Sequence, residues 1–225
     1  MNIVYGKGPR SAGAFFVWGF MFADIDHLVK LLKGVNDIRE TVRLYTLAST
    51  PTVASIDDLK YAFEQMDGRP IRIGMIGNSK EELARGIYLP YNDRVVILLD
   101  GSMTTFAARY VAVKEMCSLV LKDDQYLTPD AADLVSILVA EHKKPSDGEA
   151  PDHVTADAWA EVAATELLFP FNERASARQR LADRQVTLFE LSEQYQIPER
   201  IIEDALDSEY DGMCQCAWDT MQKVP

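Results

Sequence analysis

Lys114 and Ser118 lie four positions apart in a largely apolar stretch, with Glu115 beside them. Residues with this spacing share one face of a helix. A desolvated lysine can then act as the base for a hydroxyl one turn away. No oxyanion hole is evident in the surrounding sequence. The spacing leaves a hydrolase built on Ser118 and Lys114 open as one hypothesis.

Histidine and cysteine, the usual zinc ligands, show no metal-binding spacing. The three histidines are His27, His142 and His153, and none lies four residues from another. Two zinc ligands on one helix need such a pair. The cysteines Cys214 and Cys216 reach Cys117 only through a long return of the chain, and the spacing of a four-ligand site is missing.

The elements that must position these residues are predicted by the spacing of apolar side chains. Periods of three to four residues predict helices over 24–47, 55–67, 103–121, 129–142 and 155–168. Gly34 divides the first of these patterns, which fits one long helix or two short ones. Thr187 and Glu190 have the spacing of a capping box, which predicts that the remaining C-terminal region is helical.

Three short strands are predicted over residues 71–76, 86–89 and 94–99 by alternation of apolar and polar residues and by the turn residues between them. The last two strands are expected to form a hairpin. Residues 143–153 are rich in proline, glycine and charge and predict a loop. The expected class is therefore α+β, mainly helical with a small sheet.

Composition narrows the classes of partner. The chain has 225 residues, 48% of them apolar and 26% charged, which is enough to bury a sizeable core. Its formal charge of −12 repels phosphate backbones and anionic lipids, so neither nucleic acid nor a membrane is expected as a partner. Three cysteines, an odd number, suit a reducing compartment, and the cytoplasm is the expected location.

The apolar run from Ala12 to Ala23 follows two basic residues and has the length of the apolar core of a signal peptide. It is too short to span a bilayer. The acidic residues Asp24 and Asp26 follow it directly, and no small-residue cleavage site is present. A buried hairpin or the start of a helix is the favoured interpretation over a targeting segment.

Two of the predicted helices resemble those of the ImmA/IrrE-type metallopeptidases, a zincin-like family. The stretch 108–121 is similar to that family's helix Arg-Phe-x-x-Ala-His-Glu-x-x-His-x-x-Leu. The stretch 157–170, which ends in Leu-Leu-Phe-Pro, is similar to the later helix that supplies the third zinc ligand. The resemblance implies a zincin-like domain over residues 1–170, followed by an acidic helical extension over 171–225 that packs on it.

The same resemblance implies that the zinc site has been dismantled. Glu115 stands at the position of the general base, but Lys114 and Ser118 stand where the family has its two histidines. The third ligand position corresponds to Asp157, with Glu161 one turn further on. A lysine ammonium has no lone pair for a metal, and a serine hydroxyl alone is a poor zinc ligand. We therefore expect no zinc cofactor and a vestigial Glu115.

Loss of the metal would leave the carboxylates of this site facing one another, which is unfavourable in a partly dry cleft. Asp157 and Glu161 lie four residues apart on one helix face, and Lys114 stands at the first lost ligand position. The sequence therefore predicts that the Lys114 ammonium pairs with Asp157 or Glu161. The alternative is that Lys114 extends into solvent.

Residues 191–202 have the pattern of a helix-turn-helix. Its second helix is acidic, however, and the region from Leu181 to Pro225 carries ten acidic and three basic residues, a net charge of −7. Such a surface repels DNA. Packing on the rest of the chain, or docking of a basic protein, is the expected role.

Three functions follow as hypotheses. The first is a catalytically inactive ImmA/IrrE relative that binds or regulates a protein. The resemblance implies a family of bacterial or phage regulators that cleave helix-turn-helix repressors. The cleft of such an inactive relative would lie between the helix at 103–121 and the hairpin, whose edge can accept an extended peptide. The second is a hydrolase that uses Glu115 with a nonstandard metal set, or Ser118 with Lys114. The third is an adaptor that acts through the acidic C-terminal helices.

Overall fold

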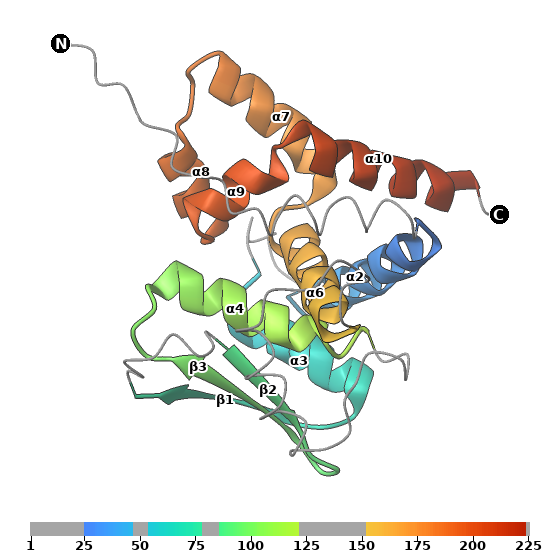
Figure 1. The fold of residues 1–225 in the computed structure, drawn as a ribbon, viewed down its shortest axis with the longest axis vertical. Coiled ribbons are helices and arrows are strands. Elements are labelled where there is room, and N and C mark those ends of the chain that lie inside the picture. The colour runs from blue at the N-terminus through green and yellow to red at the C-terminus, as the bar shows by residue number, and fades with distance from the viewer. Residues whose placement is uncertain (1–24, 47–53, 78–85, 122–151, 224–225) are drawn as a thin grey trace, which may run out of the picture.

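The computed structural model describes residues 25–46, 54–77, 86–121 and 152–223 (Figure 1). These residues form helices and one three-stranded sheet, so the predicted α+β class is confirmed. The helices are α2 (Ile25–Thr46), α3 (Ile56–Asp67), α4 (Thr105–Cys117), α6 (Asp152–Leu168), α7 (Phe171–Ala182), α8 (Leu188–Tyr195), α9 (Glu199–Ala205) and α10 (Ser208–Lys223). The strands are β1 (Ile71–Ile76), β2 (Gly86–Pro90) and β3 (Val95–Asp100).

The sheet has the strand order β1-β3-β2. Strand β1 is parallel to β3, and β2 is antiparallel to β3, with Pro90 opposite Val95. The predicted hairpin is therefore confirmed. Alternate residues of β3, beginning with Val95, are buried, and the helices lie on one face of the sheet (Figure 1). In the part of the chain that the structure describes, β1 and β2 are the two edges.

Local capping sets several helix ends where the sequence predicts them. Ser55 and Asp58 form a reciprocal capping box at the start of α3, and Gly68, with φ of 80°, ends that helix in the left-handed region. Thr187 and Glu190 form the predicted capping box at α8. These signals depend only on neighbouring residues, which is why the sequence is sufficient to predict them.

Helix α2 runs through Gly34 as one helix, which is the first of the two predicted alternatives, and a side chain at Gly34 would collide with Val120. Other boundaries differ from the prediction. Helix α4 ends at Cys117 instead of continuing to residue 121, because the backbone tightens into a turn in which Val120 N donates to Cys117 O at 2.9 Å. Helix α6 begins at Asp152, three residues earlier than expected.

Three predicted features lie wholly or mostly outside the described residues. They are the helix over 129–142, the loop over 143–153 and the apolar run from Ala12 to Ala23. Within the described ranges, no helix has both the length and the apolar character needed to cross a membrane.

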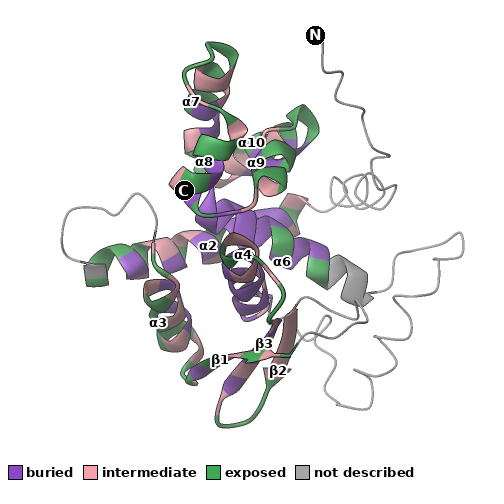
Figure 2. Ribbon diagram, turned by 90° about the vertical axis from the view of Figure 1, so that its left-hand side faces the viewer, coloured by how far each residue is buried: buried purple, intermediate pink, exposed green. Residues whose placement is uncertain are grey.

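Helix α4 occupies the centre of the fold, between the sheet and the other helices (Figure 2). Its residues from Arg109 to Val113 are buried on every side, so the sequence prediction of one buried face was too narrow. Buried side chains continue from α2 through α4 and α6 to α10 as one core. Helix α10 packs against α2, and the division at residue 170 remains a prediction.

Candidate functional site between α4 and α6

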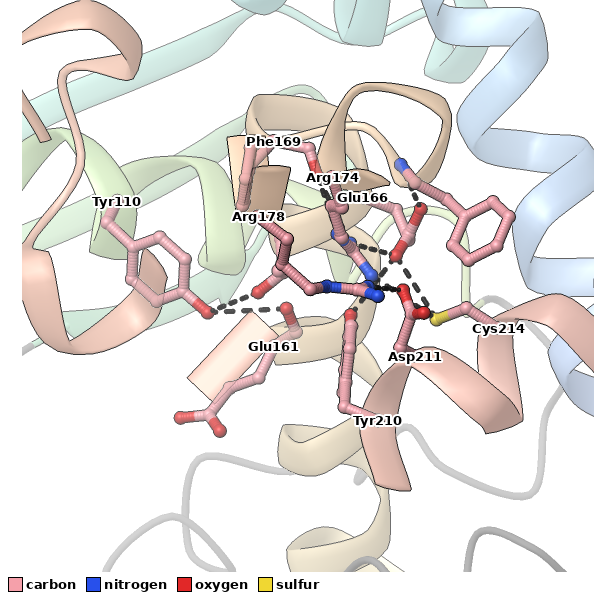
Figure 3. Close-up of polar contacts among 11 residues, drawn as sticks. Tyr110, Glu161, Glu166, Phe169, Arg174, Arg178, Tyr210, Asp211 and Cys214 are labelled. Atoms are coloured by element: carbon pink, nitrogen blue, oxygen red, sulfur yellow. Dashed lines mark hydrogen bonds and ion pairs between the residues drawn. The ribbon is translucent and has the colours of Figure 1, made fainter. Parts of the chain in front are cut away.

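Helices α4 and α6 pack against each other in antiparallel register. The Tyr110 hydroxyl donates to the backbone oxygen of Glu161 at 3.3 Å and lies 3.0 Å from Thr165 Oγ1 (Figure 3). One turn further along α4, the Lys114 ammonium donates to Asp157, one turn earlier on α6. The register therefore brings together the helix positions that the resemblance assigns to the metal site.

Lys114 forms the predicted ion pair with Asp157, and this prediction is confirmed. Its Nζ also lies 3.7 Å from Glu115 Oε1. The Lys114 side chain is 15% exposed, whereas Asp157 is 57% exposed. Burial by itself would lower the pKa of Lys114, but the carboxylates of Asp157 and Glu115 outweigh it and raise this pKa above its ordinary value. The lysine is therefore a charged donor at neutral pH.

The side chain of Glu115, which belongs to α4, lies against Gly86, the first residue of the edge strand β2. A Cβ atom added at Gly86 would lie 2.9 Å from Glu115 Oε1 and 2.5 Å from a methyl carbon of Val111. Only a glycine allows the backbone of β2 to approach α4 this closely. The buried Glu115 carboxylate thus sits between Lys114 and the first residue of the edge strand.

Glu161, the second predicted partner of Lys114, contributes charge at longer range. Its backbone oxygen receives the Tyr110 hydroxyl, and its carboxylate points away from that hydroxyl (Figure 3). Glu161 as a whole is exposed, but desolvation of its carboxyl raises its pKa, Lys114 acts in the opposite direction, and the carboxylates of Asp157 and Asp204 raise it further. Glu161 therefore resists ionisation more than an ordinary glutamate.

Ser118 and Cys117 lie at the C-terminal end of α4. Ser118 is the half-buried C-cap residue, with φ of −57° and ψ of −22°, so it keeps helical backbone angles. Lys114, the base that a Ser–Lys dyad requires, is protonated and engaged with carboxylates. Cys117 is a buried core thiol whose pKa is raised by burial and by Glu115.

The described residues of the α4–α6 site do not fit the zinc ion that binds in the family of the resemblance. Among the described residues, no three histidine, cysteine, aspartate or glutamate side chains are grouped to hold a metal. The His27 ring packs against Trp159, with ring centroids 4.8 Å apart. His153 lies in the first turn of α6, and His142 lies outside the described residues. A paired, protonated Lys114 occupies the first ligand position and offers no lone pair.

A second polar cluster, which the sequence analysis did not predict, joins α6, α7 and α10 (Figure 3). Glu166 and Arg174 form a fully buried ion pair. Tyr210 and Cys214 of α10 each donate to Glu166 Oε1 at 3.3 Å. Glu166 is the one charged residue in the stretch 162–169, and a carboxylate in such an apolar run is a signal from which a buried partner could have been predicted. Every member of this cluster contacts another member, which fits a structural role.

The predicted helix-turn-helix is present as α8 and α9. Gln196 makes the turn between them in the left-handed region, with φ of 54°. Helix α9 has only seven residues, and Glu199 and Glu203 on it are exposed. The Arg109 guanidinium of α4 donates to the backbone oxygens of Tyr195 and Gln196, which fixes the turn against the core.

Comparison of the chain with protein-family models and with curated proteins gives no match. The interpretation of the α4–α6 site therefore rests on its own residues and on their geometry.

Proposed function

We propose that this chain is a catalytically inactive relative of the ImmA/IrrE metallopeptidases and acts by binding a protein or peptide. The ion pair between Lys114 and Asp157 is the observation that carries this proposal. It joins two positions that the resemblance assigns to metal ligands. The pair satisfies both charges without a metal, so these helices can keep their packing after the catalytic function is lost.

The chemistry of the site favours binding over hydrolysis. A general base must be able to accept a proton, and the protonated Lys114 cannot do so at neutral pH. Glu115 keeps the position of the family's base, but Lys114 holds its carboxylate in an ionic contact. These observations argue against both forms of the hydrolase hypothesis.

An extended peptide with a basic side chain is the partner that this surface fits best. Strand β2 pairs with β3 alone among the described strands, so its other edge offers backbone groups for strand addition. Four carboxylates lie beside Lys114 or act on its neighbours, and they outnumber the local cations. They are Glu115, Asp157, Glu161 and Asp204. A lysine or arginine of the partner would complement this charge.

Restoring the lost ligands tests the evolutionary part of the proposal. The double variant Lys114→His and Ser118→His places two imidazoles one turn apart, with Asp157 available as a third ligand. We expect this variant to bind zinc in a titration against a competing chelator, and the matched variant Lys114→Ala and Ser118→Ala to bind none. Absence of zinc binding by the double histidine variant would contradict the relationship.

Metal analysis of the unmodified chain tests the loss of catalysis. Protein purified without chelators should contain far less than one zinc per chain, since Lys114 and Asp157 neutralise each other. Near-stoichiometric metal that is lost in Glu115→Gln would support the hydrolase hypothesis instead.

Fluorescence anisotropy with a panel of extended decapeptides tests peptide binding. One position at a time is varied, and it carries lysine, serine or glutamate while the rest of the peptide stays the same. We expect lysine-containing peptides to bind more tightly, and Glu161→Gln to weaken that preference. The matched change Glu193→Gln, on the exposed side of α8, should leave the preference unchanged. Equal binding of all three peptide classes would contradict the proposed surface.

The adaptor hypothesis has one observation in its favour. Eight acidic residues of the α8–α10 region are exposed, and they are Glu190, Glu193, Glu199, Glu203, Asp204, Asp207, Glu209 and Asp219. If this acidic surface is the main binding site, the combined change of Glu199 and Glu203 to glutamine will reduce partner binding more than Glu161→Gln does.

A further inference from the structure

A cavity of about 600 Å³ lies away from the α4–α6 site, among α2, α7 and α10. Helices α2 and α10 run beside each other in this part of the molecule (Figure 1). Pockets of this size are typical of small-molecule sites. Its lining combines one guanidinium, two aromatic rings and several side-chain amides, which include Asn36, Arg39, Phe171, Asn172, Gln215 and Trp218.

Two buried hydrogen-bond donors belong to residues that line this cavity. Among the described residues, none accepts a hydrogen bond from Arg39 Nη2 or from Trp218 Nε1. Leaving a buried donor without an acceptor is unfavourable, and more so for a charged group. The two donors come from α2 and α10, two of the helices whose residues line the cavity.

The carboxylates that act on Arg39 at longer range are bonded elsewhere. Glu166 is paired with Arg174 inside the buried cluster. Glu173 accepts a hydrogen bond of 2.6 Å from the Tyr195 hydroxyl. Glu40, which also lines the cavity, pairs with Arg43 at 2.8 Å. These carboxylates disfavour a highly charged anion, while none of the described residues accepts a hydrogen bond from Arg39 Nη2.

The two aromatic rings of the cavity restrict which chemical group can form the uncharged part of a ligand. Phe171 and Trp218 lie nearly parallel, with an interplanar angle of 20° and ring centroids 6.5 Å apart. Both rings line the cavity and offer flat apolar surface next to the two donors. A planar apolar group packs well against such surfaces.

We propose that this cavity binds a small monoanion in which a carboxylate adjoins a planar ring. The carboxylate accepts hydrogen bonds from Arg39 and Trp218, and the ring packs beside Phe171 and Trp218. A single guanidinium among neutral donors suits one negative charge better than the two of a phosphate monoester. This site is independent of the proposed function at α4 and α6.

Benzoate is a suitable probe, and benzamide is its uncharged counterpart. The chain has three tryptophans, so its indole N–H groups give three cross-peaks in a ¹H–¹⁵N spectrum of the full chain, and Trp218→Phe assigns one of them. We expect benzoate to shift the Trp218 cross-peak in a saturable way at up to about 10 mM. Benzamide and inorganic phosphate should each shift it at least tenfold less effectively at equal concentration.

Substitutions of Arg39 test whether the benzoate carboxylate binds at this residue. Arg39→Gln should weaken benzoate binding about tenfold, because a charge-assisted hydrogen bond is lost while a donor remains. Arg39→Lys should retain part of the affinity, and Arg72→Gln, on the distant strand β1, should retain all of it.

Three results would overturn the proposal. The first is no shift of the Trp218 cross-peak with benzoate, which would mean that water serves the buried donors. The second is equal binding of benzamide or phosphate in the unmodified chain, which involves no variant and no question of folding. The third is unchanged benzoate affinity in Arg39→Gln.

Discussion

The Lys114 ammonium of α4 forms the ion pair with Asp157 of α6. Replacing Lys114 with alanine removes the ammonium that contacts the buried Glu115 carboxylate and pairs with Asp157. We expect Lys114→Ala to lower the free energy of unfolding by about 1 to 2 kcal/mol, near the smaller value because Asp157 is largely solvated. Urea denaturation measures this change.

Lys33→Ala, at an exposed position on α2, is the matched control for that experiment. Its effect should stay within about 0.5 kcal/mol, as for most surface substitutions. If the two alanine variants lose the same small amount of stability, the Lys114 pair contributes nothing beyond an ordinary surface contact.

Glu161 should make stability depend on pH. Its pKa in the folded chain is raised above the usual 4.5 by burial and by Asp157 and Asp204, against the opposing effects of Lys114 and Arg200. The folded state therefore binds the proton more tightly than the unfolded state. Stability from this group is complete below pH 4.5 and is lost as the pH rises through the folded-state pKa.

The variant Glu161→Gln removes this dependence. It should be more stable than the unmodified chain at pH 8, and its advantage should disappear near pH 4.5. Denaturation curves at both pH values, with Glu193→Gln as the exposed control, measure the difference. If the stability advantage of Glu161→Gln instead increases toward acidic pH, the predicted direction of the Glu161 pKa shift is wrong.

At the scale of elements, the contact between β2 and α4 depends on the absence of a side chain at Gly86. The Cβ of an alanine would lie 2.5 Å from Val111 Cγ1 and 3.0 Å from Glu115 Cγ, so these side chains or one of the two elements must shift. We expect Gly86→Ala to lower the free energy of unfolding by about 1 to 3 kcal/mol. Gly74→Ala on β1, where the nearest side-chain atom would be 3.5 Å away, is the control.

The same elements show how far sequence reasoning reaches. The capping boxes, the hairpin and the ion pair of Lys114 with Asp157 were predictable, because each follows from fixed spacings on an element or from a family pattern. The pair of Glu166 with Arg174 and the cavity at Arg39 were not. Both depend on how three helices meet, and no spacing along the chain specifies that arrangement.

At the scale of the whole molecule, buried polar contacts link the two predicted parts of the chain. Glu166 comes from α6, before the predicted boundary at residue 170, and its partners Arg174, Tyr210 and Cys214 come after it. Removing one member of a buried ion pair is strongly unfavourable. Separating the C-terminal helices from α6 would break this cluster, so we expect both parts to unfold together.

Cysteine reactivity tests whether the chain unfolds as one unit. Cys216 is exposed, whereas Cys117 on α4 and Cys214 on α10 are buried, and burial raises the pKa of both buried thiols. An aromatic disulfide reagent should therefore modify one thiol quickly in the folded chain. In Cys216→Ser, the two remaining thiols should become reactive over the same urea range, because both belong to the continuous core. If Cys214 reacts at a lower urea concentration than Cys117, the helices after residue 170 open first and fold as a separate extension.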